Sequence, residues 1–240
     1  MKEARLCIMD KKIKFIKKVK DTLHYSVPDI SYVDGAQLAR LAGQADAKKF
    51  RFIPDKPVQN VYAEISRNIP SDYKIRLSYW VEKKDLRFPQ LPDRMTGFKV
   101  QPFRSHAEIG RVFQKTFTAD YLKPFYPKTE WKKELGVSLP IMKGKVALDD
   151  AFRVVRKGSC VGLMLLPKLE TGQDYTLVGW IWVARRLTAL ERPCVHHLMF
   201  SWLKGRMLPK AAAGVDGFNP ASQGLFRKTG FSLMSLNISK

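Results

Sequence analysis

The sequence lacks the features that mark several specialised classes of protein. It has no uninterrupted apolar run long enough for a membrane-spanning helix, and its first residues lack the apolar core of a secretory signal. Its cysteines, Cys7, Cys160 and Cys194, are odd in number and far apart, which is typical of reduced thiols rather than of a disulfide framework. We therefore expect a cytoplasmic protein without a transmembrane segment.

Acidic residues are also scarce relative to basic ones. The 240 residues include 43 lysines and arginines but only 22 aspartates and glutamates, which gives a formal net charge of +21. The excess occurs both in residues 1–95, with 20 basic and 12 acidic side chains, and in residues 96–240, with 23 and 10. Such a charge attracts polyanions, among them RNA, DNA, anionic lipid, the phosphates of coenzyme A and an acidic carrier protein. A proteome that is basic throughout is the alternative explanation.

The length and the hydrophobic content of 45% allow one large packed domain or two small ones. The best linker is Phe88–Gly97, which contains Pro89, Pro92 and a glycine. We predict an N-terminal α/β domain over residues 1–95, in which no motif identifies a role, and a second domain over residues 96–240.

In the first domain, the spacing predicts helices at Asp34–Gln44 and Val58–Arg67 and a strand at Tyr73–Val81. Residues 11–20 allow two structures. As a helix they would form a basic amphipathic surface for lipid or nucleic acid; as an edge strand, their lysines would discourage self-pairing. We favour the strand.

Beyond the linker, alternating and helical periodicities follow one another in a defined order. They predict a strand at 98–103, a helix with Ser105 and Glu108 in a capping box, an aromatic region at Tyr121–Gly136, a hairpin at 151–166 turning at Gly158, a strand at 176–183, a helix at 193–207, a strand at 211–215, a short helix, and a last strand at 231–238.

The short helix carries the most specific pattern in the chain. Asn219 is a candidate N-cap, Pro220 suits the first helical position, and Gly230 suits the position after the helix. The run resembles the last helix and following strand of the GCN5-related N-acetyltransferase (GNAT) superfamily at Asn219, Ser222, Leu225, Lys228, Gly230 and Phe231. The resemblance implies an α/β (α+β) fold with a GNAT-like mixed sheet flanked by helices, and residues 1–95 as a small N-terminal α/β extension.

The resemblance also implies where an acyl thioester binds. In the superfamily, backbone amides of the fourth strand hydrogen-bond the pantetheine and polarise the acyl carbonyl. This role falls on Trp180, Ile181, Trp182 and Val183, and the opposing strand end is Val215–Asn219. Asn219 and Ser222 correspond to contacts with the pantetheine and phosphate arm, although both also suit a structural role at the helix start. The implied co-substrate is acetyl-CoA or a longer acyl-CoA.

The chain departs from the superfamily at two places. The glycine-rich pyrophosphate loop is absent, because Leu190, Pro193 and Val195 stand at its positions. Side chains would then hold the phosphates, and the candidates are Arg185, Arg186 and Arg192. The usual general acid, a tyrosine on the last helix, is replaced by Phe226, which cannot donate a proton. Another group, a water molecule or unaided departure of the thiolate would have to serve instead.

Candidates for the general base that accepts the amine proton are Asp216, Asp174, Glu170 and Tyr175, because they lie near the two strand ends. No metal is expected, since Cys194, His196 and His197 crowd one helix start and do not converge on one ion. Trp180 and Trp182 share one face of their strand, which favours core or pocket wall over a base-stacking platform.

We therefore expect an N-acyltransferase that moves an acyl group from a thioester of coenzyme A, or of an acidic acyl carrier protein, to an amine on a small molecule or protein. The acceptor would lie under the aromatic side chains of Tyr121, Phe125, Tyr126 and Trp131. The alternative is a basic nucleic-acid-associated protein whose GNAT-like fold has lost catalysis. Acylation of an aminoacyl-tRNA or another RNA-bound acceptor would combine the two.

Overall fold

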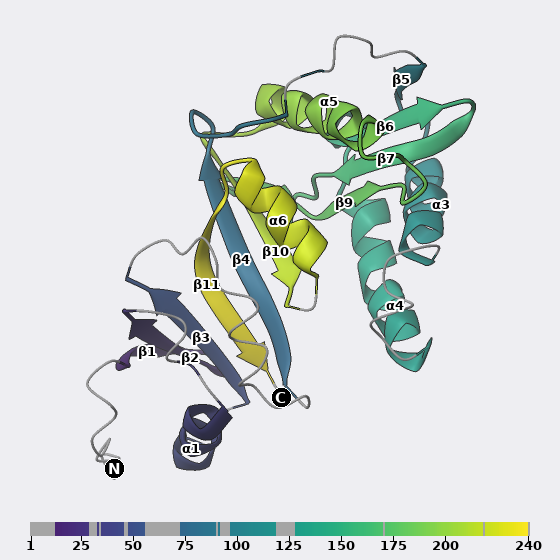
Figure 1. Ribbon diagram of the computed structural model, residues 1–240. Coiled ribbons are helices and arrows are strands. Elements are labelled where there is room, and N and C mark those ends of the chain that lie inside the picture. Colours follow the sequence, from purple (N-terminus) through teal and green to yellow (C-terminus); the bar gives the residue numbers. More distant parts are fainter. Residues whose placement is uncertain are drawn as a thin grey trace. The chain divides into compact units, whose positions relative to one another are not determined.

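The computed structural model describes residues 13–28, 33, 35–45, 48–55, 73–89, 91, 97–118, 128–169, 171–217 and 219–239 (Figure 1). These form a mixed α/β structure with one sheet in the order β1-β2-β3-β11-β4-β10-β8 and another in the order β5-β6-β7-β9. Outside the described residues lie the predicted helix Val58–Arg67 and the candidate residues Tyr121, Phe125, Tyr126 and Glu170. No described helix is long and apolar enough to cross a membrane.

The chain divides into two compact units. The first comprises residues 1–80, 214–227 and 231–240, and the second comprises residues 81–213 and 228–230. The first unit therefore contains both ends of the chain. The predicted boundary near residue 95, as a border between separately folding domains, stays a prediction.

The first unit is built on five strands and two helices of the described chain: β1 (Lys14–Val19), β2 (Thr22–Val27), α1 (Gly35–Ala45), β3 (Lys49–Pro54), β4 (Lys74–Glu82), α6 (Pro220–Lys228) and β11 (Ser232–Ser239). The C-terminal strand β11 pairs antiparallel with both β3 and β4. Residues 11–20 were predicted as an edge strand, and β1 confirms this at the end of the sheet. The predicted helix Asp34–Gln44 is confirmed as α1.

Alternation along these strands separates an apolar face from a polar one. Leu23 and Tyr25 of β2, Phe52 of β3, Leu77 of β4 and Leu236 of β11 are all almost fully buried. The rings of Tyr25 and Phe52 stack with centroids 5.5 Å apart. The core of the first unit is therefore on one side of its sheet.

The second unit contains the remaining elements: β5 (Phe98–Gln101), α3 (His106–Thr116), α4 (Lys128–Gly144), a 3-10 turn (Leu148–Asp150), β6 (Ala151–Arg156), β7 (Ser159–Leu165), β8 (Thr176–Val178), β9 (Trp180–Val183), α5 (Glu191–Arg206) and most of β10 (Lys210–Asp216). The predicted capping box is confirmed, because the Glu108 N–H donates to the Ser105 hydroxyl and the Glu108 carboxylate accepts from the Arg104 N–H. The hairpin β6–β7 turns at Lys157 and Gly158, both with positive φ, as its two-residue turn requires.

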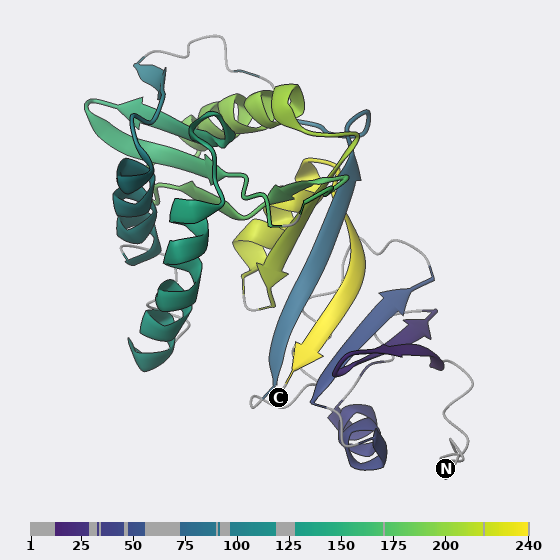
Figure 2. The ribbon, with the colours of Figure 1, turned by 180° about the vertical axis from the view of Figure 1, so that it is seen from behind.

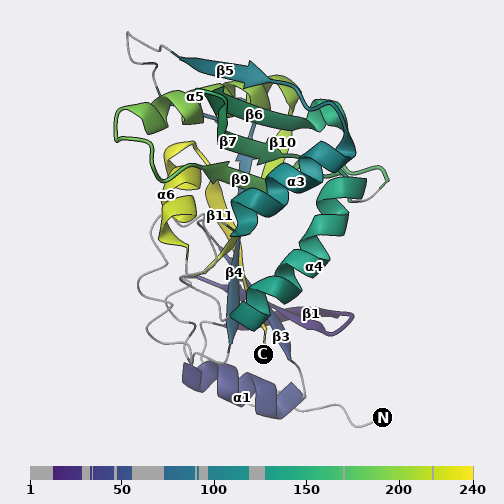
Figure 3. The ribbon, with the colours of Figure 1, turned by 90° about the vertical axis from the view of Figure 1, so that its right-hand side faces the viewer.

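Helix α5 packs directly on the sheet of the second unit (Figure 3). A Cβ added to Gly162 of β7 would lie 2.5 Å from Cγ1 of Val195. Because glycine stands at 162, the helix backbone approaches the strand closely, and Val195, Met199 and Phe200 become fully buried.

Candidate functional site

The strand predicted at 176–183 is not continuous, and this correction defines the site. Its first half, β8, pairs parallel with β10, whereas its second half, β9, pairs antiparallel with β7. Between them, the Gly179 N–H donates to the Leu165 carbonyl at 3.0 Å, although the ladder partner of Leu165 is Trp180. Gly179 and Trp180 thus both lie opposite Leu165, which is the pattern of a β-bulge. The bulge turns the strand from one sheet into the other.

Beyond the bulge, the ladder determines which amides of β9 face outward. The Ala184 N–H donates to the directly opposite Val161 carbonyl at 2.9 Å. Hydrogen-bonded and non-hydrogen-bonded pairs alternate in an antiparallel ladder, so Trp182 is bonded to β7, whereas Ile181 and Val183 are not. β9 is also the last strand of its sheet in the described chain. The N–H groups of Ile181 and Val183 therefore point away from β7, at an open strand edge.

The tryptophan side chains of β9 belong to the packing of the second unit. The Trp180 indole N–H donates to the Thr116 hydroxyl at 3.2 Å, and its ring contacts Phe113 of α3 and Phe117, the residue that follows this helix. Trp182 is 7% exposed, and no described atom accepts a hydrogen bond from its buried indole N–H. The predicted role of these residues in binding a cofactor therefore rests on their backbone.

The three predicted phosphate ligands follow β9, Arg185 and Arg186 in the loop and Arg192 in the first turn of α5, and they differ in their hydrogen bonds. Arg185 and Arg186 are exposed. Arg192 instead donates to the carbonyls of Leu187 and Arg185, at 3.1 and 2.8 Å. Arg192 is also exposed, but its guanidinium holds the loop in shape, which leaves Arg185 and Arg186 as the arginines whose side chains form no hydrogen bond or ion pair within the described chain.

The start of α5 is closed by a capping box that the sequence reading missed. The Glu191 N–H donates to the Thr188 hydroxyl, and the Thr188 N–H donates to the Glu191 carboxylate at 2.9 Å. Glu191 also forms an ion pair with Arg156. The backbone hydrogen bond from Thr188 lowers the pKa of Glu191, and the Arg156 guanidinium lowers it further. A negative charge therefore already occupies the helix N-terminus, where a phosphate would otherwise be favoured.

In the first unit, Asn219 caps α6 as predicted. Its side-chain oxygen accepts the Ser222 N–H at 3.1 Å, and both residues are 9% exposed. Phe226 is 2% exposed and lies against the rings of Tyr79 and Phe231. These contacts describe a cap and a core residue. A cofactor contact by Asn219, Ser222 or Phe226 stays a prediction.

Two of the candidate bases, Asp174 and Tyr175, come just before β8 in the chain, on the other side of the bulge from β9. Asp174 is exposed and forms an ion pair with Lys210 at 3.3 Å, and Tyr175 is half-buried beside it. Five residues, among them the bulge residue Gly179, lie between Tyr175 and Ile181 along the chain. Asp216 belongs to the first unit and is half-buried at the end of β10. A role as general base for Asp174, Tyr175 or Asp216 stays a prediction.

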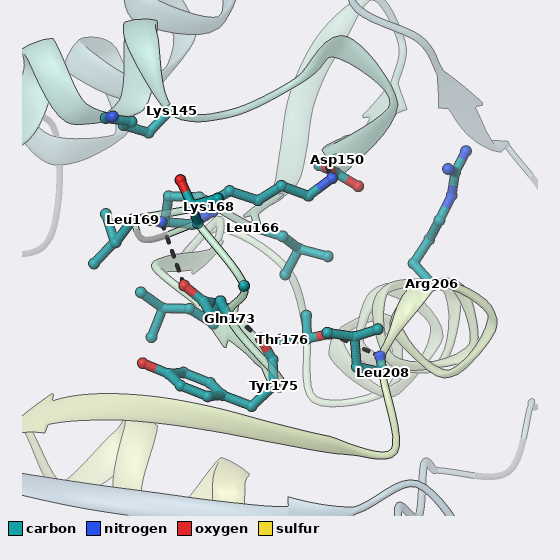
Figure 4. Close-up of a pocket in the computed structure, with 14 residues that line it drawn as sticks. Lys145, Asp150, Leu166, Lys168, Leu169, Gln173, Tyr175, Thr176, Arg206 and Leu208 are labelled. Atoms are coloured by element: carbon teal, nitrogen blue, oxygen red, sulfur yellow. Dashed lines mark hydrogen bonds and ion pairs between the residues drawn. The ribbon is translucent and has the colours of Figure 1, made fainter.

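A cavity of about 490 Å³ lies beside the first half of the split strand (Figure 4). Its cations are Lys145, Lys168 and Arg206, and its carboxylate is Asp150, which pairs with Lys168 at 3.2 Å. Figure 4 shows Lys145 and Arg206 on opposite sides, with Asp150 and Lys168 between them. Further lining residues are Leu166, Pro167, Gln173, Tyr175, Thr176 and Leu208. This cavity could not be predicted from the sequence, because its lining combines residues 145–177 with Arg206 and Leu208 at the other end of α5.

The cysteines and histidines of α5 do not form a reactive cluster. Burial raises the pKa of the Cys194 thiol, and burial together with Arg192 and Lys228 lowers the pKa of His196 to about 4. His197 makes its own hydrogen bond with the Pro89 carbonyl at 2.6 Å. Within the described residues, no group of three or more His, Cys, Asp or Glu side chains is arranged to hold a metal ion.

No family model and no curated protein sequence matches the chain. Structural neighbours across most of the chain are GNAT acetyltransferases, and the likeness is one of fold alone. A GNAT protein from Sphaerobacter thermophilus is 13% identical, with a TM-score of 0.49 over 94% of this chain and 74% of that one. A GNAT acetyltransferase from Colwellia psychrerythraea is 13% identical, with a TM-score of 0.48 over 91% and 77%. A protein of unknown function from Staphylococcus epidermidis is 14% identical, with a TM-score of 0.47 over 97% and 91%.

Proposed function

We propose that this protein is an N-acyltransferase that binds a pantetheine thioester along the open edge of β9 and transfers its acyl group to an amine. The observation that carries the proposal is the bulge at Gly179, followed by the outward N–H groups of Ile181 and Val183. Pantetheine is a chain of amides that can pair with such an edge as an added strand would. A fixed N–H near the thioester stabilises the negative charge that develops on its carbonyl oxygen.

The reaction needs few further groups. The amine nitrogen attacks the thioester carbon, a C–N bond forms, the C–S bond breaks, the amine proton passes to a base and the thiolate takes up a proton. A thiol with an ordinary pKa of about 8.5 is an adequate leaving group without a dedicated acid. This is compatible with Phe226 at the position where the superfamily has a tyrosine. Asp216, Asp174 and Tyr175 remain the proposed candidates for the base.

The donor is acetyl-CoA, a longer acyl-CoA or the acyl-phosphopantetheine of a carrier protein. Arg185 and Arg186 are the proposed phosphate ligands, because they are exposed and follow β9 directly. Glu191 disfavours a pyrophosphate at the α5 N-terminus, since its carboxylate already receives that hydrogen bond. This feature favours a donor that relies on its pantetheine arm more than on its nucleotide.

The cavity of Figure 4 is the proposed acceptor pocket. Its wall residue Pro167 contacts Gly179, the residue immediately before β9. Within the described chain, no ion pair joins the side chain of Lys145 or Arg206 to a carboxylate. An amine that also carries a carboxylate or phosphate therefore fits the pocket better than a simple polyamine.

The test is coenzyme A binding followed by turnover. A ligand at 100 times its Kd stabilises the native state by about 2.7 kcal/mol, which raises the Tm by several degrees. We expect a saturable Tm increase with coenzyme A and with phosphopantetheine, but not with adenosine 3′,5′-bisphosphate. We then expect release of free thiol from acetyl-CoA with amino acids or phosphorylated amines as acceptors. No Tm change with either pantetheine compound would contradict the proposal.

A further inference from the structure

The polar face of the sheet in the first unit carries aligned basic residues. Strand register places side chains side by side in two rows that cross β1, β2, β3, β11 and β4. The first row is Lys17, His24, Arg51, Asn237 and Arg76. The second row is Val19, Thr22, Lys49, Ser239 and Lys74. We call these rows the basic face; the strands that bear them are visible in Figure 2.

The basic face is the side of the sheet opposite to the core. On β2, β3, β11 and β4 its residues alternate with buried ones, such as Tyr25 on β2 and Leu77 on β4, whereas every residue of β1 is exposed. Lys17, Lys74 and Arg76 are exposed. The Arg76 side chain lies across Gly214, where an added Cβ would be 2.7 Å from its Nε. The absence of a side chain at 214 gives this guanidinium its place on the sheet surface.

The cations of the basic face are only partly neutralised. Lys49 pairs with Asp21 at 2.6 Å, and Asp55 accepts a hydrogen bond from Ser26. By strand alternation, Asp216 shares the side of β10 on which Gly214 meets Arg76. Within the described chain, no ion pair joins Lys17, Lys74 or Arg76 to a carboxylate. A positive potential therefore extends over these rows.

The first row also contains a histidine. His24 lies between Lys17 and Arg51 in the first row. Burial lowers its pKa first, and the charges of Arg51 and Lys17 lower it further. His24 is therefore neutral at physiological pH, and the basic face owes its charge to lysine and arginine.

We propose that the basic face binds the phosphodiester backbone of a nucleic-acid duplex. In the first row, cations stand on alternate strands, and so about 10 Å apart, close to three base-pair rises of 3.4 Å. The hydroxyl group of Ser239 lies between Lys49 and Lys74 in the second row and supplies a further phosphate donor. The net charge of +21 adds long-range attraction for a polyanion.

The composition of the rows favours a duplex over a single strand or a membrane. Neither row contains Phe, Tyr or Trp, so unpaired bases find no stacking platform there. A duplex presents the highest phosphate density, which rewards contacts made by charge alone. A lipid surface would need apolar side chains among the cations, and the rows offer only Val19. Binding is expected to be independent of base sequence and strongly dependent on salt.

The test is fluorescence anisotropy of a labelled duplex of about 20 base pairs, in DNA and RNA forms, titrated with full-length protein from about 50 to 200 mM salt. The test variant is K17Q/K74Q/R76Q, which removes exposed cations without touching the bond of Arg51 to Ser235. The matched control is K115Q/K132Q/K133Q, which removes the same charge from exposed positions of α3 and α4. We expect the test variant to bind at least tenfold more weakly and the salt slope to fall by about 3, while the control stays close to wild type.

A second variant tests the same face without removing any cation. Ser239→Glu places a carboxylate between Lys49 and Lys74 and is expected to weaken duplex binding, while acyl transfer is unchanged. An equal loss of duplex affinity in K17Q/K74Q/R76Q and in the control K115Q/K132Q/K133Q would overturn the proposal, because it would show a nonspecific charge effect. Tighter binding to a single strand, or to vesicles of phosphatidylglycerol and phosphatidylcholine, than to the duplex would also overturn it.

Discussion

The Cα of Gly179 lies against the ring of Pro167: a Cβ at residue 179 would be 2.5 Å from both Cγ and Cδ of the proline. No real side chain tolerates that distance, so one of the two backbones would have to move. Gly179 is the bulge residue at which the strand passes from β8 to β9. The contact therefore fixes the point from which the outward amides of Ile181 and Val183 are presented.

Gly179→Ala should damage both stability and donor binding. Overpacking of this kind costs about 1–3 kcal/mol, and relief requires a shift of β9 away from its present edge. Urea denaturation measures the first effect, and titration with coenzyme A measures the second. Gly205→Ala is the control, because an added Cβ there meets nothing within 4 Å and the position is helical. A loss of stability with unchanged affinity for coenzyme A would show that the bulge at Gly179 does not position the donor site.

Arg185→Gln/Arg186→Gln should weaken the binding of coenzyme A but not that of pantetheine, which carries no phosphate. Both side chains are exposed, so their removal should leave the Tm nearly unchanged. A charge-assisted phosphate contact contributes about 1.5–3 kcal/mol, which predicts at least a tenfold higher Kd for coenzyme A. Calorimetric titration of the two ligands at equal salt gives the comparison. An equal loss for both ligands would place the arginines on the pantetheine arm instead.

Glu191→Gln should increase the affinity for coenzyme A. The amide of glutamine keeps an acceptor for the Thr188 N–H but removes the negative charge from the start of α5. The Arg156 guanidinium, now without its carboxylate partner, adds positive potential to the same place. Titration at low salt should reveal the gain, and the gain should shrink as salt rises. An unchanged affinity would show that no phosphate approaches this helix end, and a lower affinity would show that the Glu191 carboxylate supports binding.

His196 should make the folded state sensitive to acid. Its pKa is lowered from an ordinary 6.5 to about 4, so the folded state resists protonation. The stabilising contribution is complete above pH 6.5 and is lost as the pH falls from 6.5 toward 4. Between neutral pH and pH 5, the free energy of unfolding of wild type should fall by about 2 kcal/mol more than that of His196→Gln. His106→Gln, at an exposed position, is the control. If the free energy of unfolding fell equally with pH in wild type and in His196→Gln, this prediction would be wrong.

Local signals were sufficient for many elements. Ser105 with Glu108 predicted the start of α3, and Asn219 predicted the start of α6, because caps are set by residues a few positions apart. The capping box of Thr188 and Glu191 has the same signature and was overlooked. It would have indicated in advance that the phosphate-binding end of α5 is occupied by a carboxylate.

The break at Gly179 was not predictable from its own segment. Residues 176–183 alternate as one strand, and the bulge depends on Pro167 and Leu165, which come from elsewhere in the chain. The position of β11 between β3 and β4 is equally non-local, since it joins residues more than a hundred positions apart. The basic face required the full register, because its lysines and arginines are scattered in the sequence.

The most direct measurement is the response of individual backbone amides of β9 to a pantetheine ligand, followed by ¹⁵N–¹H NMR. The account predicts that S-acetonyl-coenzyme A, an analogue that cannot transfer its acyl group, shifts the Ile181 and Val183 amides and slows their hydrogen exchange. The Trp182 amide, which already faces β7, should change less. Saturable binding that leaves the Ile181 and Val183 amides unchanged would contradict the proposed site, and no binding at all would contradict the proposed function.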